Sequence, residues 1–270
     1  MAKDNAQLAD RLSTQGASTA PVQVLAGIRE WHKKNEGALA TLLGSKQNAE
    51  KLYLAAVHSI SRNPYLLSCD KSSLCQCMMQ SAHLDLYPGP LQECAYVPFK
   101  GKATFIPQYQ GLVKLALQSG IIGNIRAVVV FERDEFDYNE GTEAYIRHRR
   151  YPGEDPGAPI AAYCTWRSGE QTDFELMFKR EIDSIMSRSA AVKQGRSTPW
   201  DTDWEEMAKK TVIKRASKKW PKSIKLAQAI EVDNAVERPD LEQKPVIDIS
   251  SLVVEESEGV GAAEGESPSL

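Results

Sequence analysis

The amino-acid sequence predicts an α+β fold: a single core domain with a small antiparallel sheet flanked by helices, a disordered N-terminal arm and an acidic C-terminal tail. Alternating apolar segments lie between helical ones, without the regular strand–helix alternation of a doubly wound sheet. Residues 231–270 hold eleven acidic and two basic residues, a net charge of −9, so with a whole-chain charge of −3 residues 1–230 carry +6. We therefore expect an arm over 1–25, a core over 26–232 and a tail over 233–270.

The composition is that of an ordinary globular protein, with 42% hydrophobic and 26% charged residues among 270. No apolar run is long enough to span a bilayer, and the polar start lacks the apolar segment of a signal peptide. The five cysteines are odd in number and lack the spacing of a disulfide framework. We expect a cytoplasmic protein in a reducing compartment, with no membrane partner.

Helical spacing and capping residues predict the elements of the N-terminal half. Helices are expected over residues 27–43, 48–61, 72–84 and 108–119. Asn48 and Asp70 are placed to cap the second and third of these helices, and Gly120 to end the fourth. Residues 94–99 and 103–107 alternate as strands, and the Lys-Gly-Lys connection between them is typical of a hairpin.

The C-terminal half is expected to begin with strands. They are predicted over residues 125–133, within 136–149 as a pair, and over 160–167 and 172–178. Residues 151–159 contain three Pro and two Gly and are expected to form a loop. A helix over 179–188, a mobile polar loop over 190–199 and a basic helix capped by Asp201 should follow, with disorder after residue 234.

The basic helix is the strongest functional signal. Between residues 209 and 225 the sequence has eight Lys or Arg and no acidic residue. Ala208, Val212, Ala216 and Trp220 form an apolar face on a helical wheel, with most cations opposite. A charge run is usually a solvated face, but such faces mix both signs through i,i+4 pairs. We therefore expect contact with nucleic acid. The cations concerned are Lys209, Lys210, Lys214, Arg215 and Lys218, with Lys210, Lys214 and Lys218 as one DNA-facing row.

Other segments supply further cations and flat side chains. The hairpin and the helix after it contribute Lys100, Lys102, Gln108, Tyr109 and Lys114. Alternation places Phe99 and Phe105 inside, which leaves Tyr109 as the candidate for stacking on bases. The remaining candidates are Arg147, Arg149 and Arg150 at a strand end, Lys179 and Arg180 at a helix start that disfavours cations, and Lys193 and Arg196 in the polar loop.

The sequence contains little that indicates catalysis. It lacks the GxxxxGK[ST] motif of ATP-driven motors. Cys75 and Cys77 point apart on a helix, so buried thiols are a better interpretation than a metal site. We expect no cofactor and no catalysed chemical step.

Two other classes of protein remain as alternatives. Four acidic residues form the densest acidic group outside the tail, either as a solvated turn or as the Mg²⁺ site of a nuclease. They are Glu132, Asp134, Glu135 and Asp137. A regulator that binds double-stranded DNA is disfavoured, because no helix-turn-helix pattern surrounds the basic helix.

Three blocks of sequence carry a resemblance to a known family. They are LDLYPGPLQECAYVPFKGKATFIPQYQGLVKLALQSG, a strand region ending in RDEF, and WEEMAKKTVIKRASKKWP. In this order they resemble the RecT family of phage and prophage single-strand annealing proteins, over roughly residues 48–232. The resemblance implies binding of single-stranded DNA, pairing of complementary strands without ATP, and homo-oligomeric rings or helical filaments. It also implies a phage exonuclease as a partner that produces the single strand.

The resemblance further implies a basic groove along the oligomer that holds single-stranded and annealed duplex DNA. Its matching residues are Lys100, Lys102, Gln108, Tyr109, Lys114, Arg126, Lys209, Lys210, Lys214, Arg215 and Lys218. Binding through phosphates leaves base edges free for pairing, which predicts steep salt dependence and little sequence preference. The acidic tail is either a solubilising end, a contact for the host single-strand-binding protein, or a DNA mimic that restrains binding.

Overall fold

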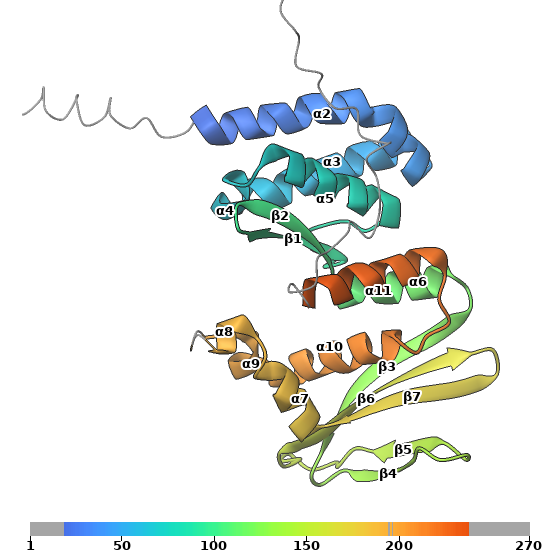
Figure 1. The fold of residues 1–270 in the computed structure, drawn as a ribbon. Helices are drawn as coiled ribbons and strands as arrows, with labels where there is room; N and C mark the ends of the chain where they lie inside the picture. Colours follow the sequence, from blue (N-terminus) through green and yellow to red (C-terminus); the bar gives the residue numbers. More distant parts are fainter. Residues whose placement is uncertain (1–18, 194, 196, 238–270) are drawn as a thin grey trace, which may run out of the picture.

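A computed structural model describes residues 19–193, 195 and 197–237 of the chain (Figure 1). Helices and strands are mixed, which confirms the α+β fold class. Within these residues the expected small sheet consists of three separate antiparallel sheets, of two, three and two strands. In Figure 1 the N-terminal helices lie at the top and the β4–β5 hairpin at the bottom, with the C-terminal helices between them.

Four helices form the N-terminal layer: α2 (Thr19–Leu43), α3 (Lys46–Ser61), α4 (Pro64–Leu67) and α5 (Lys71–Leu84). Since α2 begins at Thr19, residues 19–25 are helical and not part of a loose arm. The N-cap of α3 is Ser45, whose Oγ accepts a hydrogen bond from the backbone amide of Asn48 at 3.1 Å. Asn48 therefore lies inside the helix. Asp70 caps α5 as expected, by accepting from the amide of Ser73 at 2.9 Å.

The first hairpin pairs β1 (Cys94–Phe99) with β2 (Lys102–Pro107) and leads into α6 (Tyr109–Gln118). Its turn contains two residues, Lys100 and Gly101, with φ angles of 49° and 77°. Two central residues with positive φ match a type I′ turn, whose twist suits a hairpin. Lys102 therefore belongs to β2, where it pairs with Phe99.

The three-stranded sheet has the order β3-β6-β7 and consists of β3 (Ile122–Phe131), β6 (Pro159–Ser168) and β7 (Gln171–Phe178). A second hairpin, β4 (Glu135–Asn139) with β5 (Tyr145–Arg149), covers one face of this sheet. Phe136 and Ile146 of the hairpin pack there on Val130, Tyr163 and Phe174. The hairpin and the sheet thus enclose a small second core.

The C-terminal part consists of α7 (Lys179–Met186), α8 (Ala190–Lys193), α9 (Pro199–Thr202), α10 (Trp204–Ser217) and α11 (Ile224–Glu237). The expected loop over 190–199 therefore contains a short helix. Asp201 lies in α9, where it accepts from the amide of Thr198 at 2.7 Å, and does not cap the basic helix. Asp203 occupies the N-cap position of α10 without a side-chain hydrogen bond.

The boundary expected at residue 233 falls within α11, which continues to Glu237. The disorder expected after residue 234 therefore does not apply to residues 235–237, and the rest of the acidic tail lies outside the described residues.

Helix α10 packs its apolar face on the three-stranded sheet, as the helical wheel predicted. Ala208, Val212 and Ala216 have no exposed surface. Trp220 is 2% exposed but lies after the end of α10 at Ser217, not on the helix as the wheel assumed. The ring of Trp220 meets that of Trp166 on β6 edge to face, with centroids 6.4 Å apart. Burying a side chain such as Val212 stabilises the fold by roughly 1.5 to 3 kcal/mol, so this face fixes the position of the cations on the rest of the helix.

Candidate nucleic-acid interface

The predicted row of lysines on α10 is divided between the interior and the surface. Lys214 Nζ lies 2.8 Å from a carboxylate oxygen of Asp233 on α11, and Asp233 is 4% exposed. Lys210 is half-buried beside this pair. Burial and the charge of Lys214 lower the pKa of Lys210, and Asp233 only partly opposes them. Lys218 alone of the three is exposed, so Lys210 and Lys214 line the junction with α11.

Arg215 joins α10 to the sheet and to α7. Its Nε lies 2.7 Å from Glu175 of β7, which is 3% exposed, and its Nη1 lies 2.8 Å from Glu181 of α7. Lys219, which was not among the candidates, also contacts Glu175. Burial alone would lower the pKa of Arg215, but the two carboxylates raise it above its ordinary value. Arg215 is thus part of an intramolecular ion-pair network at the surface, centred on the buried carboxylate of Glu175.

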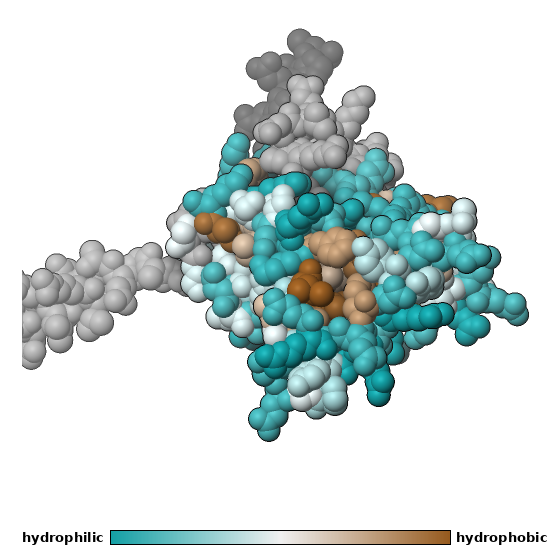
Figure 2. All heavy atoms as spheres, turned by 90° about the horizontal axis from the view of Figure 1, so that it is seen from below, coloured by the Kyte–Doolittle hydropathy of each residue, from teal (hydrophilic) through white to brown (hydrophobic). Residues whose placement is uncertain are grey.

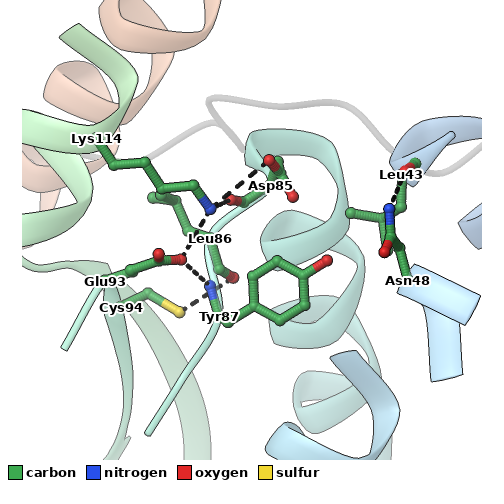
Figure 3. A network of polar contacts seen from close by, with 8 residues as sticks. All are labelled: Leu43, Asn48, Asp85, Leu86, Tyr87, Glu93, Cys94 and Lys114. Carbon is green, nitrogen blue, oxygen red and sulfur yellow. Dashed lines mark hydrogen bonds and ion pairs between the residues drawn. The ribbon is translucent and has the colours of Figure 1, made fainter. Parts of the chain in front are cut away.

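Lys114 has a similar structural role on α6 (Figure 3). Its Nζ lies 3.0 Å from a carboxylate oxygen of Glu93 and 3.6 Å from one of Asp85, and it donates to the backbone carbonyl of Asp85. It also lies 5.1 Å from the ring centroid of Tyr87. The side chain ties α6 to the segment between α5 and β1.

Four further candidates have partners within the chain. Lys179 pairs with Asp183, which also accepts a hydrogen bond from the indole of Trp204. Lys209 Nζ lies 2.6 Å from Glu206. On the outer face of the β4–β5 hairpin, Arg149 lies 3.7 Å from Glu135, and Arg147 stands opposite Asp137 and stacks over Tyr145.

The remaining basic candidates have no carboxylate partner in the part of the chain that the structure describes. They are Lys100, Lys102, Arg126, Arg150, Arg180, Lys193 and Lys218, all of them exposed. Arg196 lies outside the described residues. Because an unpaired exposed cation keeps its full charge for an external ligand, these residues are better candidates than the paired ones.

The tip of the first hairpin combines cations with an exposed aromatic ring. Phe99 is 54% exposed, contrary to the expectation that it lies inside, whereas Phe105 is 2% exposed as expected. Strict alternation from Cys94 explains the difference, because Cys94 and Tyr96 face the core and Phe99 therefore faces outward. Lys100 Nζ lies 5.3 Å from the centroid of the Phe99 ring.

Gln108 and Tyr109 lie where β2 passes into α6. Gln108 is at the N-cap position of α6, and its backbone amide donates to the backbone carbonyl of Glu93 at 2.9 Å. Tyr109 is half-buried and packs against the main core, and its hydroxyl accepts from Gln110. The Tyr109 ring is therefore less available for stacking on bases than that of Phe99.

A pocket of about 510 Å³ lies between the β3-β6-β7 sheet and the β4–β5 hairpin; we call it the β3–β5 pocket. Its polar lining residues are Arg126, His148, Arg150, Tyr163, Thr165 and Lys209. Sequence reasoning missed Tyr163 and Thr165, because only the strand register places them beside Arg126. On the face seen from below, near the hairpin, hydrophilic side chains surround a small apolar area (Figure 2).

The acidic residues between 132 and 137, which are the basis of the nuclease alternative, do not converge on one point. Asp134 accepts from His148, Glu135 is near Arg149, and Glu132 accepts from the amide of Ala158 at 3.1 Å. Within the described ranges, no group of three or more His, Cys, Asp or Glu residues could hold a metal ion. Nor does any described helix have the length and apolar character needed to cross a membrane.

All five cysteines are free and buried, which agrees with the prediction that they are structural thiols.

Comparison with known proteins gives two kinds of similarity. The sequence profile of the RecT family matches residues 50–249. The chain is 35% identical over 240 residues to Protein RecT of Escherichia coli strain K12, covering 83% of this chain and 87% of that protein. It is 28% identical over 221 residues to the uncharacterized protein YqaK of Bacillus subtilis strain 168, covering 80% of this chain and 75% of that protein.

Proposed function

This chain belongs to the RecT family of single-strand annealing DNA recombination proteins, and from that premise we propose that it pairs complementary DNA strands without ATP. In this proposal DNA is held through its phosphates in a basic groove that runs along an oligomeric ring or filament. The family membership, which extends over most of the chain, is the observation that carries the proposal. A phage exonuclease would supply the single strand, and a host single-strand-binding protein is a further candidate partner.

The distribution of charge supports a phosphate-binding mode. Exposed cations that have no carboxylate partner among the described residues occur at the first hairpin tip, on β3, after β5 and near the end of α10, for example Lys102, Arg126, Arg150 and Lys218. Phosphate contacts position a strand without reading its sequence. They also leave the base edges accessible to a second strand, which annealing requires.

The paired cations support a different role for the rest of the basic helix. Lys214 and Arg215 bind buried carboxylates of α11 and β7. Breaking such a pair leaves an uncompensated buried charge, which is costly. We therefore assign these two residues to the fold of the groove wall and not to direct DNA contact.

Annealing of two complementary oligonucleotides tests the proposal. The strands carry a donor and an acceptor fluorophore, and the protein is mixed with one strand before the other is added, without nucleotide. We expect energy transfer to rise faster than in the protein-free reaction, with no rise for a non-complementary strand. Electron microscopy of the same mixtures tests the ring or filament. Degradation of either strand with Mg²⁺ would instead support the nuclease alternative.

A further inference from the structure

The β3–β5 pocket gathers side chains from four segments of the chain. Arg126 of β3 stands opposite Thr165 of β6 in the strand register, and Tyr163 lies two residues earlier on the same strand. Because alternate residues of a strand share a face, all three belong to the face that the β4–β5 hairpin covers. Arg150 follows β5, and Lys209 reaches the pocket from α10. The site therefore exists only in the folded chain.

The pocket is positively charged. No acidic residue lines it within the described chain, and neither Arg126 nor Arg150 has a carboxylate partner there. Lys209 pairs with Glu206, whose side chain is 65% exposed. By contrast, Arg149 on the outer face of the same hairpin is close to Glu135. Cations kept without counter-ions around a concave site favour an anion from outside the chain.

Two hydroxyl groups add neutral hydrogen-bonding capacity to the pocket. Burial raises the pKa of Tyr163, although Arg126 and Arg150 partly oppose this. The phenol therefore stays protonated at neutral pH, and its hydroxyl is shared with His148 Nδ1, which lies 3.1 Å away. Thr165 is half-buried beside Arg126, and its hydroxyl has the same capacity without any charge.

A buried chain of hydrogen bonds holds the wall of the pocket in place. His148 Nε2 lies 2.9 Å from a carboxylate oxygen of Asp134, and His148 Nδ1 lies 3.1 Å from the Tyr163 hydroxyl. Asp134 also accepts from the amides of Phe131 and Tyr151, so it is the acceptor and His148 Nε2 the donor. The chain links the β3–β4 turn, β5 and β6, and so fixes the hairpin beside Arg126 and Arg150.

We propose that the β3–β5 pocket binds a phosphodiester group of the DNA strand, with Arg126 and Arg150 as charged donors and Thr165 as a neutral one. This inference rests on the proposed function and gives it a specific phosphate site. The planar guanidinium fork matches two phosphate oxygens at once. A volume of about 510 Å³ exceeds that of a bare phosphate and leaves room for the adjoining sugar.

The salt dependence of oligonucleotide binding tests the site. Removing the cation that neutralises one phosphate should reduce the slope of log affinity against log salt by about 0.7 for a single strand. Because Arg126 and Arg150 hold the same phosphate, we expect Arg126→Gln/Arg150→Gln to lower the slope by about 0.7. The control, Arg62→Gln/Arg188→Gln, removes the same charge from two exposed helix-end positions and should lower it less. A slope equal to that of the wild type or of the control would overturn the proposal.

Two further variants separate binding from folding. Arg126→Lys/Arg150→Lys keeps both charges and should restore the slope, while its affinity stays below that of the wild type because lysine lacks the fork. Thr165→Val should weaken binding several-fold at an unchanged slope, since it removes an uncharged donor. If the lysine variant has a slope as low as that of the glutamine variant, or if Thr165→Val has no effect, the proposed geometry of the phosphate site is wrong.

Three ligands distinguish the sources of phosphate. Equal affinity for 5′-phosphorylated and 5′-hydroxyl oligonucleotides supports a phosphodiester, whereas a preference for the 5′-phosphate that only the glutamine variant loses would overturn that assignment. The assignment would also be overturned if inorganic phosphate, at matched ionic strength, competes for the pocket while the glutamine variant binds DNA as the wild type does. If the wild type anneals DNA and the glutamine variant has the salt slope of the wild type, the pocket is not a phosphate site, but the proposed annealing function is unaffected.

Discussion

His148 and Asp134 form a buried pair that joins the β4–β5 hairpin to the end of β3. The two side chains are 4% and 1% exposed, and the His148 Nε2 atom lies 2.9 Å from the Asp134 Oδ2 atom. Burial alone would raise the pKa of Asp134, but the amides of Tyr151 and Phe131 and the ring of His148 hold it below its ordinary value. The ionised carboxylate is therefore the form that stabilises this part of the fold.

Asp134→Asn should destabilise the protein most at neutral pH. Because the pKa of Asp134 is depressed in the folded state, its stabilising contribution is present above the unfolded-state pKa and is lost as the pH falls through the folded one. We expect a loss of roughly 3 kcal/mol in the free energy of unfolding near pH 7. Urea unfolding at about pH 7 and about pH 3 measures both effects. A variant as pH-sensitive as the wild type over that range would contradict this role.

Lys214 and Asp233 should behave as a coupled pair that holds α10 to α11. Lys214→Met leaves a buried carboxylate without this partner and should cost on the order of 3 kcal/mol. Adding Asp233→Leu should recover much of that loss, because the unpaired charge is then removed too. Thermal and urea unfolding of the two single variants and the double variant give the coupling energy. Strictly additive effects would show that the 2.8 Å contact does not stabilise the protein.

The hairpin tip should contribute to DNA affinity without contributing to stability. Lys100→Asn keeps a residue that tolerates the left-handed backbone of the turn, and Lys102→Gln keeps the length of the side chain. The double variant should lower the salt slope by about 1.4 if both lysines contact phosphate. Lys33→Gln/Lys51→Gln, at two exposed positions on α2 and α3, is the charge-matched control. Equal salt slopes for the two double variants would show that the hairpin tip does not contact DNA.

The thiols should resist alkylation in the folded protein. Burial raises the pKa of Cys75 and of Cys164 to about 12, so almost no reactive thiolate is present at neutral pH. We expect slow reaction of the native protein with a thiol reagent at about pH 8 and fast reaction of all five cysteines in urea. Fast reaction of the native chain at several sites would show that the cysteine-rich helix α5 opens readily.

The parts of the fold set by local sequence were predictable. Asp70 caps its helix, and the residues around Lys100 and Gly101 form a hairpin, because capping and turn chemistry depend on neighbouring residues alone. The cap at Ser45 was missed, although it is a local feature, because Asn48 offered a competing signal. The outward position of Phe99 also follows from alternation once the strand is counted from Cys94.

The role of each cation was not predictable, because it depends on contacts between distant segments. Arg215 in the last turn of α10 and Lys218 at its C-cap are three residues apart, yet Arg215 binds Glu175 and Glu181 whereas Lys218 is exposed. The β3–β5 pocket likewise needs the register of β3 against β6, which brings Arg126 to Thr165. A charge pattern therefore identified the kind of partner but not which basic residues are available to it.

The central claim, that the chain holds DNA through phosphates and leaves its bases free to pair, has one direct measurement. The affinity of the full chain for oligo(dT) and for a mixed-sequence oligonucleotide of equal length is measured between about 50 and 300 mM salt, together with the rate of annealing. We expect the affinities for the two oligonucleotides to fall in parallel as the salt concentration rises, by roughly 10³-fold or more if six or more phosphates are contacted. The rate of annealing should fall with them. Affinity that barely changes over this range, or that depends strongly on sequence, would contradict the central claim.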